Sequence, residues 1–68
     1  MKRQVYYILE WFEDKEGNRT AKTAWEGIDP NEARTRFNEA EVTAEKPFVE
    51  AYMQNPDGDD YRLEIKWY

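Results

Sequence analysis

The segment Asn55-Pro56-Asp57-Gly58 constrains the fold most, because it joins two stretches in which apolar residues alternate along the chain. Proline at the second position of a type I turn, followed by glycine where φ must be positive, is typical of a tight hairpin connection. A three-residue loop closed by a bulge then sets a register that places apolar residues opposite one another. The expected pairs are Met53 with Tyr61, Ala51 with Leu63, Val49 with Ile65 and Pro47 with Trp67. The alternate positions pair Tyr52 with Arg62, Glu50 with Glu64 and Phe48 with Lys66.

An earlier part of the chain predicts another hairpin. Residues 3–13 are dense in β-branched and aromatic residues, which favour a half-buried sheet surface, and residues 19–27 read as the partner strand. The intervening residues 14–18 are rich in turn formers, with Gly17 as the left-handed residue of a bulge. This register pairs Glu13 with Arg19, Glu10 with Lys22, Trp11 with Ala21 and Tyr7 with Trp25.

A short helix is predicted between the two hairpins, from about residue 30 to 41. Asp29 is a favourable N-cap, Pro30 suits the first helical position, and Glu32 completes a capping box. The apolar stripe of this helix consists of Ala33, Phe37 and Ala40. Only Phe37 is large, so we expect the helix to sit close to a sheet.

The predicted fold is therefore α+β, with the element order ββαββ, in a single domain spanning residues 1–68. We expect a four-stranded, largely antiparallel sheet with the short helix packed on one face. The patterns leave the order of the strands in the sheet open. The core face is expected to carry Val5, Tyr7, Leu9, Trp11, Trp25, Val49, Ala51, Met53, Leu63, Ile65 and Trp67.

The opposite face of the predicted sheet is also partly apolar. A helix of about 11 residues spans about 16 Å and covers one face at most. Aromatics on the uncovered face are compatible with a solvated surface that packs beneath Arg and Lys stems. We favour an interaction surface, because tyrosine and phenylalanine are typical of interface cores. The predicted surface binds a second copy of the chain or another protein, through Tyr6, Ile8, Phe12, Phe48 and Tyr52.

Acidic residues at the two hairpin tips suggest a different function. The net charge is −5, and carboxylates of this kind are suited to mimic nucleic-acid charge and block the basic groove of another protein. In size and charge the chain is similar to small phage-encoded inhibitors as a class. The acidic surface of this alternative consists of Asp14, Glu16, Asp57, Asp59 and Asp60.

Composition narrows the remaining function classes. The chain has no His and no Cys, so imidazole catalysis, disulfides and thiolate metal sites are excluded, and we expect neither an enzyme nor a cofactor. The residues near Asp57 and Asp59 resemble a calcium loop only in part, and turn chemistry explains them, so no metal site is predicted. The negative charge disfavours nucleic acid and anionic membranes as partners. No run of apolar residues is long enough to span a membrane, and we expect a cytoplasmic protein.

Overall fold

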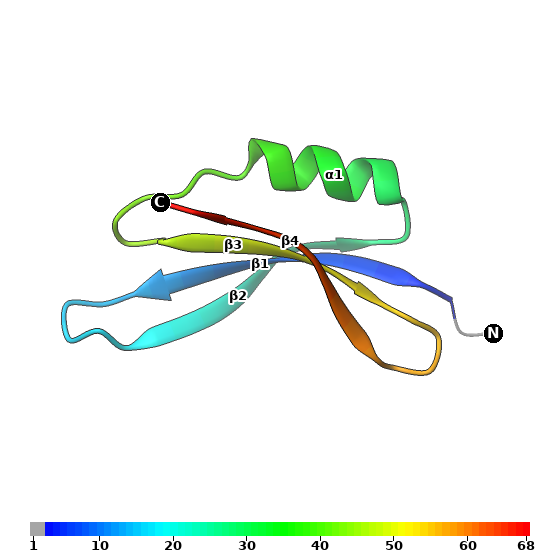
Figure 1. Ribbon diagram of the computed structural model, residues 1–68, viewed down its shortest axis with the longest axis horizontal. Coiled ribbons are helices and arrows are strands. Elements are labelled where there is room, and N and C mark those ends of the chain that lie inside the picture. The colour runs from blue at the N-terminus through cyan, green and yellow to red at the C-terminus, as the bar shows by residue number, and fades with distance from the viewer. Residues whose placement is uncertain (1–2) are drawn as a thin grey trace.

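The computed structural model describes residues 3–68 and shows a four-stranded antiparallel sheet with one helix on one face (Figure 1). The elements are β1 (Val5–Glu13), β2 (Arg19–Gly27), α1 (Pro30–Glu39), β3 (Phe48–Gln54) and β4 (Asp60–Trp67). The strand order is β2-β1-β3-β4, so β1 and β3 are central and the other two strands form the edges. This confirms the predicted ββαββ order and α+β class, and it supplies the strand order that the sequence patterns left open.

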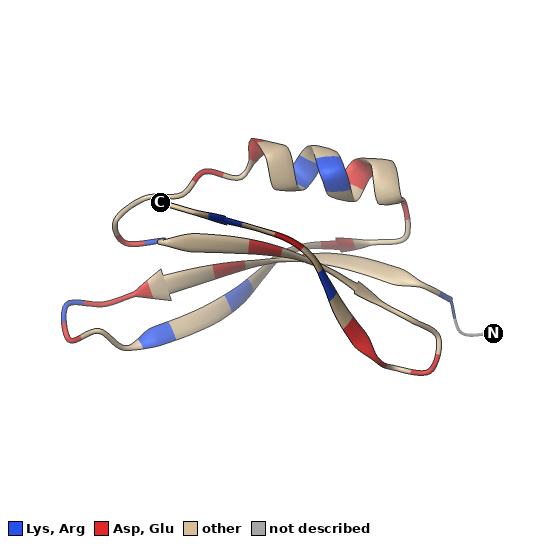
Figure 2. Cartoon of the chain, viewed as in Figure 1, with Lys and Arg blue, Asp and Glu red and all other residues tan. Residues whose placement is uncertain are grey.

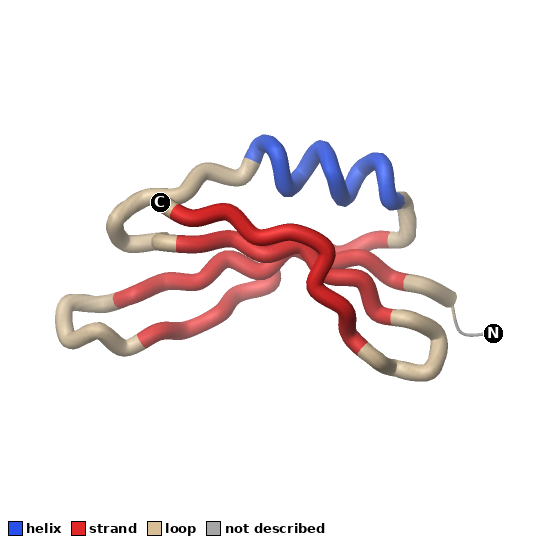
Figure 3. The backbone as a smooth tube through the Cα atoms, viewed as in Figure 1, coloured by secondary structure: helices blue, strands red, loops and turns tan. Residues whose placement is uncertain are grey.

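The helix crosses over the sheet on its way from β2 to β3. Both of these strands run antiparallel to β1, which lies between them, so they are parallel to each other. The chain must therefore return along one face of the sheet, and α1 makes this return over β1, β2 and β3 (Figure 3). In residues 3–68, only one of the two sheet faces is covered by a helix.

Local chemistry fixes where α1 begins and ends. Oδ1 of Asp29 accepts hydrogen bonds from the amides of Asn31 at 2.8 Å and Glu32 at 3.5 Å, which confirms the predicted N-cap. The Glu32 side chain binds Arg36 one turn later, at 3.3 Å. The helix ends at Glu39, two residues before the expected end, because the backbone of Ala40 is extended.

The core between α1 and the sheet is small. Ile8 and Val49 are its only large side chains below 2 % exposure among the described residues. Phe37 of the helix and Ala51 of β3 complete the buried cluster, and Trp25 packs at its margin. Trp25 also lies across Gly27, where a Cβ atom would come within 2.5 Å of the indole ring.

Near the turns, the hairpin registers match the predicted ones. Gly17 and Gly58 have φ of +84° and +95°, as left-handed turn positions require. The observed pairs include Glu13 with Arg19, Glu10 with Lys22, Trp11 with Ala21, Met53 with Tyr61 and Tyr52 with Arg62.

Farther from the turns, a β-bulge in each hairpin overturns the predicted register. The extra residues are Ala24 in β2 and Leu63 in β4, which stand opposite no single partner. Beyond each bulge the pairing shifts by one residue, and the side chains of the edge strand change faces. The observed pairs are Ile8 with Trp25, Tyr7 with Glu26, Ala51 with Glu64, Glu50 with Ile65, Val49 with Lys66 and Phe48 with Trp67. The expected like-charge pair of Glu50 with Glu64 does not form.

The bulges also correct the predicted core face. Because Trp25 pairs with Ile8, the helix-facing side of β1 is the one that carries Ile8. Several residues expected in the core consequently lie on the side of the sheet away from the helix: Val5, Tyr7, Leu9, Trp11, Ile65 and Trp67. Val49 and Ala51 occupy the core as predicted.

Candidate interaction face

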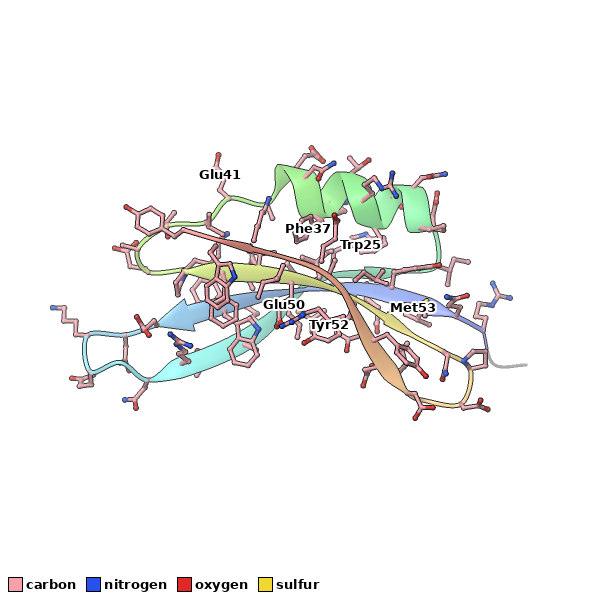
Figure 4. The ribbon with its side chains drawn as sticks, viewed as in Figure 1. Trp25, Phe37, Glu41, Glu50, Tyr52 and Met53 are labelled. Atoms are coloured by element: carbon pink, nitrogen blue, oxygen red, sulfur yellow. The ribbon has the colours of Figure 1, made fainter. Side chains whose placement is uncertain are left out.

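The side of the sheet away from α1, called the open face from here on, is largely aromatic. Figure 4 shows Glu50 and Tyr52 on this side, whereas Phe37 and Trp25 lie between the sheet and the helix. The pairing and the alternation of side chains along each strand assign its other members. Within residues 3–68, the larger apolar and aromatic residues of the open face are Val5, Tyr7, Leu9, Trp11, Phe48, Tyr52, Ile65 and Trp67.

Three aromatic rings form a continuous ladder across β1, β3 and β4. The ring centroids of Trp11 and Phe48 are 5.4 Å apart, and those of Phe48 and Trp67 are 4.5 Å apart. The guanidinium of Arg19 lies over the Phe48 ring, 5.3 Å from its centroid. Phe48 is buried, but Trp67 is 60 % exposed. This aromatic ladder therefore ends in a large indole surface that residues 3–68 leave accessible.

A pair of tyrosines continues the aromatic surface toward the β3–β4 turn. The rings of Tyr7 and Tyr52 stack at 5.2 Å with an angle of 6° between their planes. The Tyr7 hydroxyl donates a hydrogen bond to Oδ1 of Asp60 at 2.9 Å. Burial, together with the hydrogen bond and negative charge of Asp60, raises the pKa of Tyr7 to about 12. Both hydroxyls are held as neutral donors, since burial and Glu50 also raise the pKa of Tyr52.

A buried carboxylate joins the ladder to the tyrosine pair. Glu50 is only 4 % exposed although it lies on the open face. Its Oε1 accepts a hydrogen bond from Trp11 Nε1 at 2.5 Å, and its Oε2 accepts from Tyr52 Oη at 3.0 Å and Arg62 Nη1 at 3.2 Å. These donors come from three strands, so Glu50 fixes the relative positions of their side chains. With both oxygens engaged, this carboxylate serves as a structural acceptor.

The structure divides the predicted interface residues between the two faces. Phe48 and Tyr52 lie on the open face. Ile8 is 1 % exposed in the core beneath the helix, and Tyr6 and Phe12 share its side of β1, so their assignment to the uncovered face is wrong. Sequence reasoning missed Trp11 and Trp67 as members of the open face. The apolar alternation of Ile65 and Trp67 was visible, but only the bulge at Leu63 assigns these side chains to a face.

The predicted acidic surface is split between the two ends of the molecule. Figure 2 shows the β1–β2 turn and the β3–β4 turn at opposite ends of the long axis, which measures 43 Å. Asp14 acts within its own turn, where hydrogen bonds from the Asn18 amide, the Asn18 side chain and the Glu16 amide lower its pKa. Of the other members, Glu16, Asp57 and Asp59 are exposed, and Asp60 binds Tyr7. The acidic-inhibitor hypothesis stays a prediction, and its five residues do not form one continuous patch.

Other places for a ligand are less developed. A groove of about 300 Å³ lies between the first turns of α1 and β4, with Ala33, Leu63 and Glu64 among its lining residues. Within residues 3–68, no three His, Cys, Asp or Glu side chains are grouped as a metal site requires. The helix of this part of the chain is too short and too polar to cross a membrane.

Comparisons with protein-family models, with curated proteins and with solved structures find no match.

Proposed function

We propose that this protein is a non-enzymatic protein-interaction module whose docking surface is the open face. The observation that carries the proposal is the aromatic ladder of Trp11, Phe48 and Trp67, which ends in an exposed indole. Tryptophan and tyrosine dominate the binding energy of protein interfaces because they bury a large area with little loss of side-chain freedom. A cytoplasmic location, which the absence of cysteine supports, is part of the same proposal.

Two features of the sheet support docking through its face. The Glu50 hydrogen bonds hold Trp11 and Tyr52 in fixed positions before any partner arrives, which reduces the ordering that binding requires. Each edge strand carries a β-bulge, at Ala24 and Leu63, and bulges at an edge discourage pairing with a strand of another chain. Docking is therefore favoured on the face rather than at the edges.

Photo-crosslinking in cells tests this proposal. A benzoylphenylalanine placed at position 67 reports contacts of the open face, and the same group at position 63 is a matched control. Leu63 is also exposed, at 50 %, but it lines the groove beside α1. We expect covalent adducts from position 67 that are absent or much weaker from position 63, with the masses of the adducts identifying the partner. Equal adducts from both positions, or adducts from position 63 alone, would contradict docking through the open face.

A further inference from the structure

We infer that the occupant of the open face is a second copy of this chain, packed face to face across the aromatic ladder. This inference rests on the proposed function and names its partner. Two sheets that pack face to face lie about 10 Å apart and form one shared core. The resulting assembly has four layers, with the two copies of α1 on the outside and the ladders of Trp11, Phe48 and Trp67 between the sheets.

The core within one chain is too thin to stabilise the fold well. A domain of this length buries only about 60 % of its unfolded surface and has little stability to spare. Among residues 3–68, the helix side supplies only Ile8 and Val49 as fully buried large side chains, with Phe37 and alanines around them. The radius of gyration is 12.6 Å, compared with about 11 Å for a compact domain of this length. A second apolar layer on the open face makes up for this thin core, and the partner must then be present whenever the chain is folded. A second copy of the chain is present wherever the chain itself is made.

The charged groups of the open face are also compatible with a second copy. Arg62 binds Glu50, Arg19 binds Glu13 at 2.9 Å, and Asp60 accepts from Tyr7. These charged groups therefore already have partners within the chain. A buried charge without a partner is strongly unfavourable, whereas covering one that is already hydrogen-bonded costs only its remaining contact with water. A second open face offers an apolar surface and demands no new ionic partner for these three groups, whereas the exposed Glu26, opposite Tyr7, lies on the edge strand β2 away from the ladder.

The test is sedimentation equilibrium of the full chain from low to high micromolar concentrations, for wild type, Trp67→Ala and Leu63→Ala. We expect a reversible wild-type dimer whose dissociation constant rises at least about tenfold in Trp67→Ala, because an exposed tryptophan that becomes buried in an interface is a typical hot spot. Leu63→Ala removes an exposed side chain of similar accessibility on the helix side and should change the constant by less than about twofold. Circular dichroism of each variant, at the same concentrations, verifies that the fold is retained.

Three outcomes would overturn the inference. A wild-type chain that stays monomeric at every concentration excludes the second copy, whatever the variants do. A dimer that Leu63→Ala weakens and Trp67→Ala spares uses the helix side instead. A monomer that crosslinks from position 67 to a different protein overturns the second copy while leaving the proposed function intact, so the two failures are distinguishable.

Discussion

At the scale of single residues, Glu50 is the side chain on which the open face depends most. Replacing it with alanine leaves Trp11 Nε1 and Tyr52 Oη without their acceptor, while the half-exposed Arg62 is able to turn to water. We expect Glu50→Ala to lower the free energy of unfolding by about 2 kcal/mol, measured by urea denaturation. Glu64→Ala is the matched control, because Glu64 is exposed, and it should change stability by less than about 0.5 kcal/mol. Equal effects of the two changes would contradict the structural role of Glu50.

Tyr7 makes stability depend on pH in the alkaline range. Its pKa is about 12 in the folded chain and 10.0 ordinarily, so between these values the unfolded chain loses a proton that the folded chain keeps. The stabilisation from Tyr7 is complete below pH 10 and is lost as the pH rises toward 12. Between pH 10 and 12, we expect the free energy of unfolding, measured by urea denaturation, to fall more for wild type than for Tyr7→Phe. The variant has no phenol at this position to titrate. In an absorbance titration of phenolate, the same substitution should remove a late-titrating group. Parallel stability curves for the two proteins would refute this assignment.

At the scale of elements, Lys66 of β4 secures the end of α1. Its Nζ donates hydrogen bonds to the carbonyls of Phe37 at 2.6 Å and Asn38 at 3.4 Å, and it lies 4.8 Å from the centroid of the Phe37 ring. A cation at a helix C-terminus and over an aromatic ring is stabilising in both respects. We expect Lys66→Met to lower the free energy of unfolding by about 1 kcal/mol and to speed amide hydrogen exchange in the last turn of α1.

Lys22→Met is the control for this substitution. Lys22 is exposed on the edge strand β2, and its cross-strand neighbour Glu10 binds Lys46 at 2.6 Å instead. The change should leave both stability and exchange in α1 nearly unaltered. If amide exchange in α1 is equally fast in both variants, the hydrogen bonds of Lys66 do not stabilise the last turn of α1.

The elements also show which parts of the fold the sequence can predict. The N-cap at Asp29 and the turns at Gly17 and Gly58 follow from chemistry within a few residues, so they were predictable and are confirmed. The bulges at Ala24 and Leu63 depend on how distant strands pack. Each bulge lets one edge strand keep the register set by its turn and still place the correct side chains in the core, and the turn residues contain no information about the core. A single extra residue in each edge strand reversed the assigned face of β1 and of most of β4.

The same limit applies to the candidate site. Phe48 and Tyr52 were placed correctly, since β3 alternates regularly from Phe48 to Gln54 beside β1. The burial of Glu50 was not predictable, because its donors Trp11 and Arg62 come from strands far apart in the chain. A glutamate in a strand is ordinarily a solvated residue, and only the assembled sheet turns this one into an acceptor at the centre of an aromatic surface.

At the scale of the whole molecule, net charge opposes the association that the open face favours. Each chain carries −5, and acidic turns lie at both ends of the long axis, so two copies repel one another at low ionic strength. Salt screens this repulsion but does not weaken apolar contact between ladders. We therefore expect the dissociation constant of the dimer to fall at least about twofold as sodium chloride is raised, measured by sedimentation equilibrium.

A charge variant isolates the origin of this salt effect. Asp57→Asn with Asp59→Asn removes two exposed negative charges from the β3–β4 turn, away from the aromatic ladder. Because repulsion is already reduced in this variant, its dimer should be tighter than that of wild type at low salt and should respond less to added salt. A dissociation constant that instead rises with salt would mean that ion pairs hold the two copies together. The ladder would then not be the centre of the interface, since its contacts have no charge for salt to screen.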